Sequence, residues 1–278
     1  MIVDSKDKFE GAITIAVDVT GKIYNKMSVY LSDAEEWIKG TLLGTPLYEK
    51  IGDFPASQLK QAELIVSLRA FIEAIPFLDL VLTPTGFGIV STNAIAPASK
   101  ERVDRLQQKA QNVLDDAVDS FLFSLNSSEL RLVWMKGETF EALTSSLIWY
   151  AEELRQYAGM KDLHRSGLLE LRTKITAAEM LISDYISDEY LKELIQSLRK
   201  NSIERGTDDD LMVSFLRRVI GLELQGDHLT AVNMLERIVN SMEMRLPDFK
   251  IYAGSQVYKL KHSTYYENKK DDSVYFFG

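Results

Sequence analysis

The feature that most constrains the fold is an unbroken helical pattern of about 26 residues that begins at Ser99. Apolar residues recur in it at every third or fourth position: Val103, Leu106, Ala110, Val113, Leu114, Ala117, Phe121, Leu122 and Leu125. This spacing is typical of an amphipathic α-helix, and a helix of this length needs other helices to cover its apolar stripe. We therefore expect a mainly α protein with a helical bundle architecture.

Three more helices are predicted in the first 160 residues. Ser32 with Glu35 three residues later forms a capping box, which predicts that a helix begins at Ser32. Residues 56–76 are apolar around most of their circumference, which predicts a core helix ended by Pro76. Residues 139–159 predict one continuous helix closed by Gly159, and the short stretch 130–138 fits either a strand or a helical turn.

The second half is also helical by its pattern. Two helices, over 176–185 and 187–200, abut at Ser187, and a third begins at the N-cap Thr207 and ends near Gly226. Another helical pattern, over 227–245, follows almost at once, so these last two helices should form an antiparallel pair. After Pro247 the chain is rich in Tyr, Phe and Val, which predicts extended segments or a hairpin.

The periodic pattern weakens between residues 159 and 175, which marks a domain boundary. We expect an N-terminal helical region over 1–160 with a small hairpin at 78–92, and a C-terminal helical region over 161–278 that ends in an extended aromatic tail. A single domain is the alternative. Seven aromatic residues lie between Tyr252 and Phe277. We expect this tail to dock on its own core; addition to a neighbour's sheet is the alternative.

Composition excludes several classes of function. The chain has 278 residues and no cysteine, which rules out disulfides, zinc ribbons, iron–sulfur clusters and thiol nucleophiles. The formal charge, 32 − 41 = −9, works against a broad nucleic-acid surface, because phosphate binding requires clustered Lys and Arg. No apolar run approaches the roughly 20 residues that cross a bilayer, and the first residues lack the apolar region of a signal peptide. We expect a cytoplasmic protein without membrane contact.

The stretch "LTPTGFGIVSTNAIAPASKERV" (Leu82–Val103) has glycines ahead of a helix, as phosphate-binding loops do. The P-loop pattern fails because no lysine follows the glycines before Lys100, and Ser91 stands where a dinucleotide-binding loop needs its third glycine. Pro84 and Gly86 instead predict a hairpin turn. The structural signature of the loop is Pro84, Gly86, Gly88 and Pro97.

One weak anion site remains at the start of the long helix. Ser99, Lys100 and Arg102 lie where backbone N–H groups of a helix N-terminus could hold an anion. An ordinary N-cap serine explains the same residues.

No other residues form a recognisable site. His164, His228 and His262 are far apart in sequence and match no metal motif, so we expect solvated side chains. The helix macrodipole accounts for the three aspartates 208–210 at a helix start. Three further aspartates of the long helix are expected to form a solvated face, with an acid–base carboxylate pair as the alternative: Asp115, Asp116 and Asp119. We predict no catalytic residue, no metal and no cofactor.

Two segments resemble a known family. "AIPFLDLVLTPTGFGIVSTNAIAPASKERVDRL" (Ala74–Leu106) resembles an uncharacterised domain-of-unknown-function family of gut-type bacteria and their prophages, and "YENKKDDSVYFFG" resembles the C-terminal end of that family. The resemblance implies a phage-derived structural protein near the head–tail connector, where small helical proteins assemble into rings. It brings no catalytic residue, and it places the protein in the virion.

These observations predict a non-catalytic phage or prophage assembly protein. It would act through protein–protein contacts, with other proteins or with itself as a homo-oligomer. An enzyme or small-molecule (anion) binder with its site around residues 83–102 is the alternative. A host regulatory protein with a peptide-binding groove is a third possibility.

Overall fold

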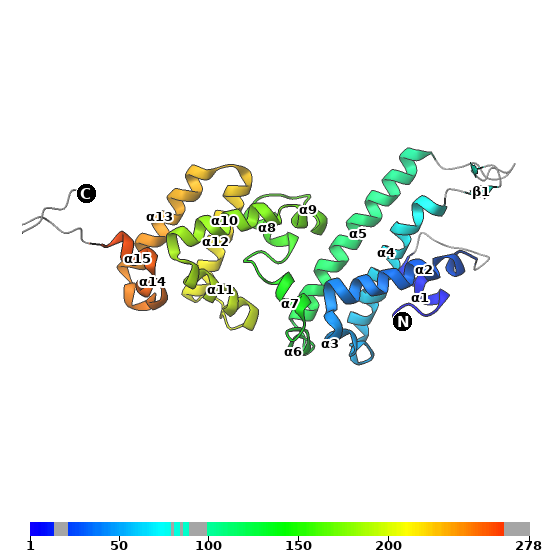
Figure 1. The fold of residues 1–278 in the computed structure, drawn as a ribbon, viewed down its shortest axis with the longest axis horizontal. Helices are drawn as coiled ribbons and strands as arrows, with labels where there is room; N and C mark the ends of the chain where they lie inside the picture. The colour runs from blue at the N-terminus through cyan, green and yellow to red at the C-terminus, as the bar shows by residue number, and fades with distance from the viewer. Residues whose placement is uncertain (14–21, 79–80, 84–85, 89–98, 264–278) are drawn as a thin grey trace, which may run out of the picture. The chain divides into compact units, whose positions relative to one another are not determined.

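The computed structural model describes residues 1–13, 22–78, 81–83, 86–88 and 99–263. The protein is mainly helical (Figure 1). It divides into two compact units. Unit 1 comprises Met1–Ser145, Trp149–Glu152 and Asp162–Glu170, and unit 2 comprises Ser146–Ile148, Glu153–Lys161 and Leu171–Gly278. No helix within the described ranges is long and apolar enough to cross a membrane.

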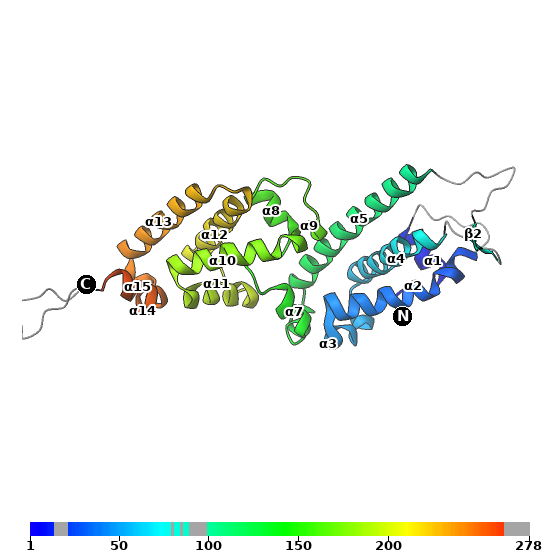
Figure 2. The same cartoon turned by 45° about the horizontal axis from the view of Figure 1, so that its top comes forward.

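Unit 1 is built around two long helices, α4 and α5, which pack against each other, with α2 on the other flank of α4 (Figure 2). A π-helical turn, Lys39–Leu43, extends α2, and a 3₁₀ turn, Ile51–Asp53, precedes α4. The elements of this unit are α1 (Lys6–Ala12), α2 (Lys22–Ile38), α3 (Gly44–Tyr48), α4 (Ala56–Leu78), β1 (Val81–Thr83), β2 (Gly86–Gly88), α5 (Lys100–Asn126), α6 (Arg131–Trp134), α7 (Glu138–Leu143) and α9 (Arg165–Glu170), together with the first residues of α8 (Ala151–Tyr157).

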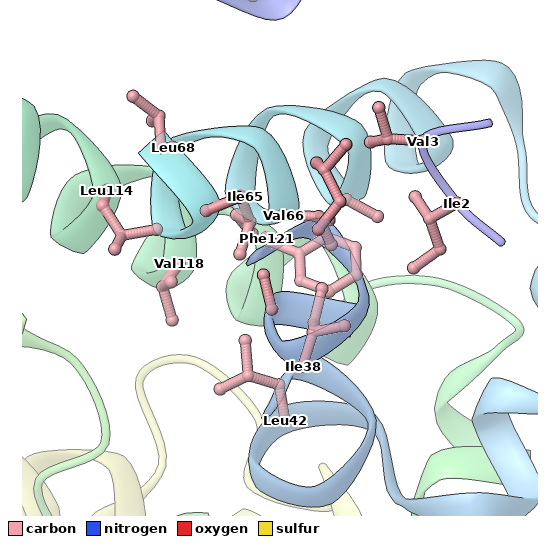
Figure 3. Packing of buried hydrophobic residues seen from close by; sticks show 14 of the residues in the cluster. Ile2, Val3, Ile38, Leu42, Ile65, Val66, Leu68, Leu114, Val118 and Phe121 are labelled. Atoms are coloured by element: carbon pink, nitrogen blue, oxygen red, sulfur yellow. The ribbon is translucent and has the colours of Figure 1, made fainter. Parts of the chain in front are cut away.

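The core of unit 1 lies between α2, α4 and α5, as the sequence predicts for a helix that is apolar nearly all round. Ile65 and Val66 of α4 and Phe121 of α5 are fully buried there (Figure 3). Trp134 fixes the far end of this core: its indole N–H donates to the carbonyl of Leu42 over 2.8 Å, and its ring meets Phe140 edge-on at 5.0 Å. Burying the Trp ring with its only donor satisfied stabilises the fold.

Two predicted boundaries in unit 1 are wrong. The helix expected to begin at Ser32 is already formed at Lys22, where the described part of α2 begins. Glu35 therefore caps nothing locally; it accepts the backbone N–H of Ile2 over 3.0 Å. Pro76 does not end its helix, because α4 continues to Leu78. A proline near a helix end removes one backbone hydrogen bond, and the burial of α4 compensates for that loss.

The helix predicted over residues 139–159 is also wrong as one element. It divides into α7 and α8, and the segment between them is not helical. In that segment the Ser146 hydroxyl and the Leu147 N–H both donate to Glu179 of α10, each over 2.7 Å. The half-buried carboxylate of Glu179, distant in sequence, thus replaces the helical bonds that periodicity would suggest. Gly159, two residues beyond α8, has a φ of 63°, in the left-handed region that favours glycine.

Residues 81–83 and 86–88 form two short antiparallel strands, with Val81 opposite Gly88 and Leu82 opposite Phe87. The predicted turn proline, Pro84, and most of the predicted hairpin 78–92 lie outside the described residues. Pro97 lies outside them too. Of the two alternatives for residues 130–138, the helical turn α6 is the one observed.

Unit 2 is helical, and the helix caps predicted from the sequence at Ser187, Thr207 and Gly226 are confirmed. Ser187 both ends α10 and begins α11, where its hydroxyl accepts the N–H of Tyr190. Thr207 is the N-cap of α12 and Gly226 its left-handed C-cap, and α12 packs against α13, which begins two residues later. The elements are α8 (its last residues), α10 (Arg172–Ile186), α11 (Asp188–Lys200), α12 (Asp208–Gln225), α13 (His228–Met244), a 3₁₀ turn (Leu246–Asp248), α14 (Lys250–Gly254) and α15 (Gln256–Lys261).

The β-prone segment expected after Pro247 is helical up to residue 261, so that prediction is wrong for α14 and α15. Phe249 and Tyr252 lie three residues apart and share a helical face, which buries both side chains. The hydroxyl of Ser255 then caps α15 by accepting the N–H of Tyr258. Burial of aromatic side chains overrides their strand preference here. Residues 264–278 of the predicted tail lie outside the described residues.

Candidate functional site

The residues of the predicted anion site lie exposed at the start of α5. Ser99 is the N-cap residue of α5, as predicted, but its side chain makes no capping hydrogen bond. Lys100 and Arg102 follow on the first turn of α5, and all three side chains are exposed. Gly86 and Gly88 form the two ends of β2, where they pair with the backbone of β1. Thr83 ends β1, and Thr85 and the polar residues between Gly88 and Ser99 lie outside the described ranges.

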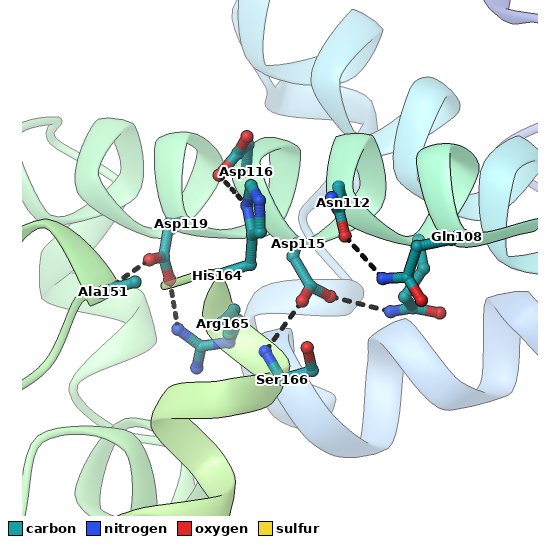
Figure 4. A network of polar contacts seen from close by, with 10 residues as sticks. Gln108, Asn112, Asp115, Asp116, Asp119, Ala151, His164, Arg165 and Ser166 are labelled. Atoms are coloured by element: carbon teal, nitrogen blue, oxygen red, sulfur yellow. Dashed lines mark hydrogen bonds and ion pairs between the residues drawn. The ribbon is translucent and has the colours of Figure 1, made fainter. Parts of the chain in front are cut away.

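The aspartates of α5 form a network with the start of α9 (Figure 4). Asp115 accepts the backbone N–H of Ser166 over 2.8 Å and the side-chain amide of Gln111 over 2.7 Å. Asp119 accepts the backbone N–H of Ala151 over 2.8 Å and lies 2.5 Å from the guanidinium of Arg165. These N–H groups belong to the first residues of α9 and α8, where helices leave backbone donors without intrahelical partners.

The prediction of a solvated aspartate face is therefore wrong for two of the three residues. Asp115 is 5% exposed, and the side chains of Asp119 and Arg165 are 14% and 6% exposed. Periodicity alone does not show that Ala151, the first residue of α8, and the start of α9 lie against these two aspartates. Because their oxygens hold helix N-termini and an arginine, these carboxylates have a structural role that accounts for their burial.

Each histidine faces a carboxylate rather than solvent alone. The distance from an imidazole nitrogen to a carboxylate oxygen is 3.0 Å for His164 and Asp116, 2.8 Å for His228 and Glu223, and 3.1 Å for His262 and Glu243. The three pairs belong to separate places in the fold. Across the described ranges, no three His, Asp or Glu side chains converge to hold a metal ion.

The acidic start of α12 is occupied by protein partners. Asp208 forms an ion pair with Arg245, with a 3.0 Å bond from Nη1 to Oδ1, and Asp210 accepts the N–H of Gly206 over 2.9 Å. The hydrogen bond from Arg245 lowers the pKa of Asp208, and the same contact raises the pKa of Arg245. Both groups therefore stay charged, and the pair joins the start of α12 to the end of α13.

Unit 2 has a groove between α12 and α13, with a volume of about 940 Å³. We call it the α12–α13 groove. One wall follows a single face of α12 at helical spacing, and the other follows a single face of α13. Its lining residues are Tyr157, Asp208, Leu211, Met212, Phe215, Arg218, Leu222, Gln225, Thr230, Asn233, Met234, Arg237, Ile238, Ser241, Met242, Arg245 and Phe249.

The groove combines exposed apolar side chains with free positive charge. Leu211 and Phe215 are 49% and 45% exposed, although both are large and apolar. Arg218 and Arg237 are exposed, and neither has a hydrogen bond or ion pair with any residue in the described part of the chain. An apolar floor flanked by cations is suited to a ligand that is apolar on one side and acidic at its edge.

The sequence pattern did not predict this groove. A signal was present: Leu211, Phe215 and Leu222 continue an apolar stripe on α12 beside the one that faces the core. A helix with such a wide stripe needs more cover than one neighbour provides. Met234 and Met242 both line the groove, Met242 as a buried side chain, whereas Met244 is 86% exposed.

Comparison with known proteins identifies one similarity. Residues 18–129 match a family model described as "Family of unknown function (DUF6712)". The match covers most of unit 1, including α2, α4 and α5, and does not reach the α12–α13 groove. No curated protein and no solved structure matches the chain.

Proposed function

We propose that the chain is a non-catalytic assembly protein of a phage or prophage particle. It works through protein–protein contacts, self-associates, and serves as a connector- or adaptor-like ring component. It acts in the cytoplasm during assembly and remains in the finished virion.

The observation that carries this proposal is the α12–α13 groove. Large apolar side chains such as Phe215 are costly to leave in water, and a continuous apolar strip on a soluble protein marks a contact surface. The groove runs between two helices over several turns, with its exposed apolar side chains on α12, and this geometry suits a helix or an extended segment of another protein.

Three further observations support an assembly role. The residues predicted for an anion or substrate site, Ser99, Lys100 and Arg102, lie exposed along a helix start and do not line the groove. The buried acids of α5, which an enzyme could use in pairs, are engaged by helix N-termini and Arg165. The net charge of −9 suits a ring through which DNA passes without adhering.

Static light scattering of the purified chain over a wide concentration range tests the proposal. We expect oligomers whose population grows with concentration. We also expect Phe215→Glu to shift the oligomers toward monomer, because a carboxylate in the groove opposes burial of its apolar floor.

Leu229→Glu is the matched control. Leu229 lies on α13, is 72% exposed and does not line the groove, so the same change of chemistry there should leave the distribution of oligomers unaltered. A parent chain that remains monomeric at every concentration would overturn self-association. Equal loss of oligomers in both variants would show that the groove is not the contact surface.

A further inference from the structure

We propose that the α12–α13 groove binds an acidic amphipathic helix of an assembly partner, a helix that carries carboxylates beside its apolar stripe. This inference deepens the proposed function, since it rests on the groove being a protein-docking surface. It adds the chemistry of the partner, which the exposed apolar side chains of the groove do not by themselves specify.

The two walls of the groove differ in polarity. On α12 the exposed lining is apolar, with Leu211 49% and Phe215 45% exposed and Leu222 half-buried. On α13 the exposed side chains that line the groove are polar: Thr230, Asn233, Arg237 and Ser241. An amphipathic helix satisfies both walls at once, because its apolar stripe covers α12 while its polar flank meets α13.

The lining of the groove is positive, although the chain as a whole is acidic. Its charged residues are three arginines and one aspartate: Arg218, Arg237, Arg245 and Asp208. The formal charge of the lining is therefore 3 − 1 = +2, against −9 for the whole chain. Because Arg245 and Asp208 pair with each other, the excess charge lies on Arg218 and Arg237.

The described part of the chain does not engage Arg218 and Arg237. Arg217, the neighbour of Arg218, shows the contrast: it forms an ion pair with Glu153, and its Nε donates to the carbonyl of Leu147 over 2.9 Å. Arg218 and Arg237 are exposed and make no hydrogen bond or ion pair with a described residue. Arg217 therefore has a structural role, whereas the guanidiniums of Arg218 and Arg237 can bind a carboxylate of another molecule.

The two arginines lie at nearly the same level of the groove. Only two residues separate α12 from α13, and the ion pair between Asp208 and Arg245 joins the opposite ends of these antiparallel helices. Arg218 is 7 residues before the end of α12, and Arg237 is 9 residues after the start of α13. At about 1.5 Å per residue, they lie about 10 Å and about 14 Å from the connection. Two cations on facing walls repel each other, and a carboxylate between them is attracted to both.

This order of side chains specifies the partner's helix. Leu211 and Phe215 precede Arg218 on the α12 wall, and Leu222 follows it one turn later. The carboxylates of the partner should therefore lie near the middle of its apolar stripe, with large apolar residues one or two turns to either side.

Two other occupants fit the groove less well. A fatty acid also joins an apolar part to a carboxylate, but its chain would cover Asn233 and Ser241 without giving either a hydrogen-bond partner. The groove of a second copy would add two guanidiniums to two that already repel each other. A contact between copies through this groove would therefore join it to a different, acidic surface of the neighbour, which is the heterologous kind of contact that closes rings.

Titration with designed peptides tests the proposal. Each peptide is an alanine-rich helix of 17 residues, the length of α13, with one leucine stripe that is flanked by Glu, by Gln or by Lys. The labelled chain is kept in the monomeric range found by light scattering, and binding is measured by microscale thermophoresis. We expect the Glu peptide to bind roughly tenfold more tightly than the Gln peptide and to lose this advantage as salt rises. The Lys peptide should not bind measurably.

Paired variants identify the arginines as the cause of this preference. Arg218→Gln combined with Arg237→Gln should weaken binding of the Glu peptide roughly tenfold and leave binding of the Gln peptide unchanged. Arg105→Gln combined with Arg205→Gln is the matched control, because both arginines are exposed outside the groove lining and the net charge changes equally. This control should bind all three peptides as the parent does. Circular dichroism of each variant verifies that the helices are intact.

The other occupants give distinct results. Tighter binding of laurate than of the Glu peptide identifies an anionic lipid as the occupant and overturns the proposal. If the chain self-associates, labelled Phe215→Glu should still join oligomers of the parent through its intact second surface. A Phe215→Glu chain that is folded but does not join them identifies the groove of a second copy as the occupant, and this also overturns the proposal.

The peptide results separate the failure of this proposal from the failure of self-association. Equal binding of the Glu and Gln peptides, or no binding of any peptide, overturns the proposal even if the parent chain forms oligomers. Equal loss of affinity in the two double variants overturns it as well, because only the net charge then matters. A preference for the Glu peptide that requires Arg218 and Arg237, in a chain that never self-associates, supports the proposal and overturns self-association alone.

Discussion

At the residue scale, Asp119 is predicted from the sequence to be solvated, but in the structure it forms a largely buried ion pair with Arg165 that stabilises the fold. Both side chains are nearly inaccessible, and Asp119 also accepts the N–H of Ala151 at the start of α8. Removing charge from one partner of a buried ion pair leaves the other without compensation, and this costs far more than the pair itself contributes.

Asp119→Asn should therefore destabilise the chain by about 3 kcal/mol, since it leaves the guanidinium of Arg165 buried and unneutralised. Urea unfolding followed by circular dichroism measures the change. Asp116→Asn is the control: Asp116 is 50% exposed, so its pair with His164 should contribute less than about 1 kcal/mol. Similar losses in both variants would contradict the structural role of Asp119.

Glu243 provides a pH-dependent prediction at the same scale. Burial acts to raise the pKa of its carboxyl, but hydrogen bonds from Lys261, His262 and Tyr252 outweigh burial and hold the pKa below its ordinary value of 4.5. A lowered pKa means that the unfolded chain binds the proton more tightly. The stabilising contribution of Glu243 is thus complete above pH 4.5 and is lost as the pH falls through the pKa of the folded state.

Glu243→Gln should lower the urea midpoint at about pH 7, and the difference from the parent should shrink as the pH falls below 4.5. Equilibrium unfolding at a series of pH values gives both curves. Glu236→Gln, an exposed position on the same helix, should leave the midpoint unchanged throughout. A difference between Glu243→Gln and the parent that stays constant with pH would contradict the ionic origin of the contribution.

At the element scale, α12 approaches the end of α8 at a glycine. A Cβ on Gly221 would collide with the carbonyl oxygen of Tyr157 and lie 3.0 Å from the backbone nitrogen of Ala158. Backbone atoms cannot move aside as a flexible side chain does, so the absence of a side chain permits this crossing.

Gly221→Ala should destabilise unit 2 by about 1–3 kcal/mol, because the added methyl forces the end of α8 away from α12. Differential scanning calorimetry measures the shift. In Gly254→Ala the new methyl meets no atom within 4 Å, and alanine favours a helix, so this control should keep or slightly raise the melting temperature. Equal melting temperatures for Gly221→Ala and the parent would contradict the close approach.

At the scale of the whole molecule, the charge balance limits the partners. Affinity for duplex DNA comes largely from Lys and Arg that neutralise phosphates and release counterions. The chain has nine more acidic than basic residues (41 against 32), and the exposed arginines of the α12–α13 groove, Arg218 and Arg237, are too few to offset them.

The chain should therefore show no binding to a fluorescent DNA duplex at physiological salt, where non-specific binders have dissociation constants of about 10⁻⁴–10⁻⁶ M. Fluorescence anisotropy over a salt series measures this. Micromolar affinity that falls steeply with salt would contradict the prediction and point to a basic surface formed by the fold.

Signals that act within one or two helical turns were predictable from the sequence alone. Thr207 caps α12, Gly226 ends it, Ser187 separates α10 from α11, and Ser99 begins α5, because each position depends on its own φ/ψ and nearby backbone groups. The apolar periodicity of residues 56–76 likewise determines that α4 is a core helix. The mainly helical fold follows from these local terms.

Only the tertiary structure decided the features that depend on neighbours distant in sequence. Glu179 interrupts the helical pattern at Ser146 and Leu147, and the backbone N–H groups of Ala151 and Ser166 engage Asp119 and Asp115 of α5. The α12–α13 groove exists because the two helices leave one shared apolar face uncovered by the described residues of unit 2. The sequence shows which apolar side chains must be buried and which polar groups need a hydrogen-bond partner. Only the folded chain determines which distant segments lie close enough to bury or bind them.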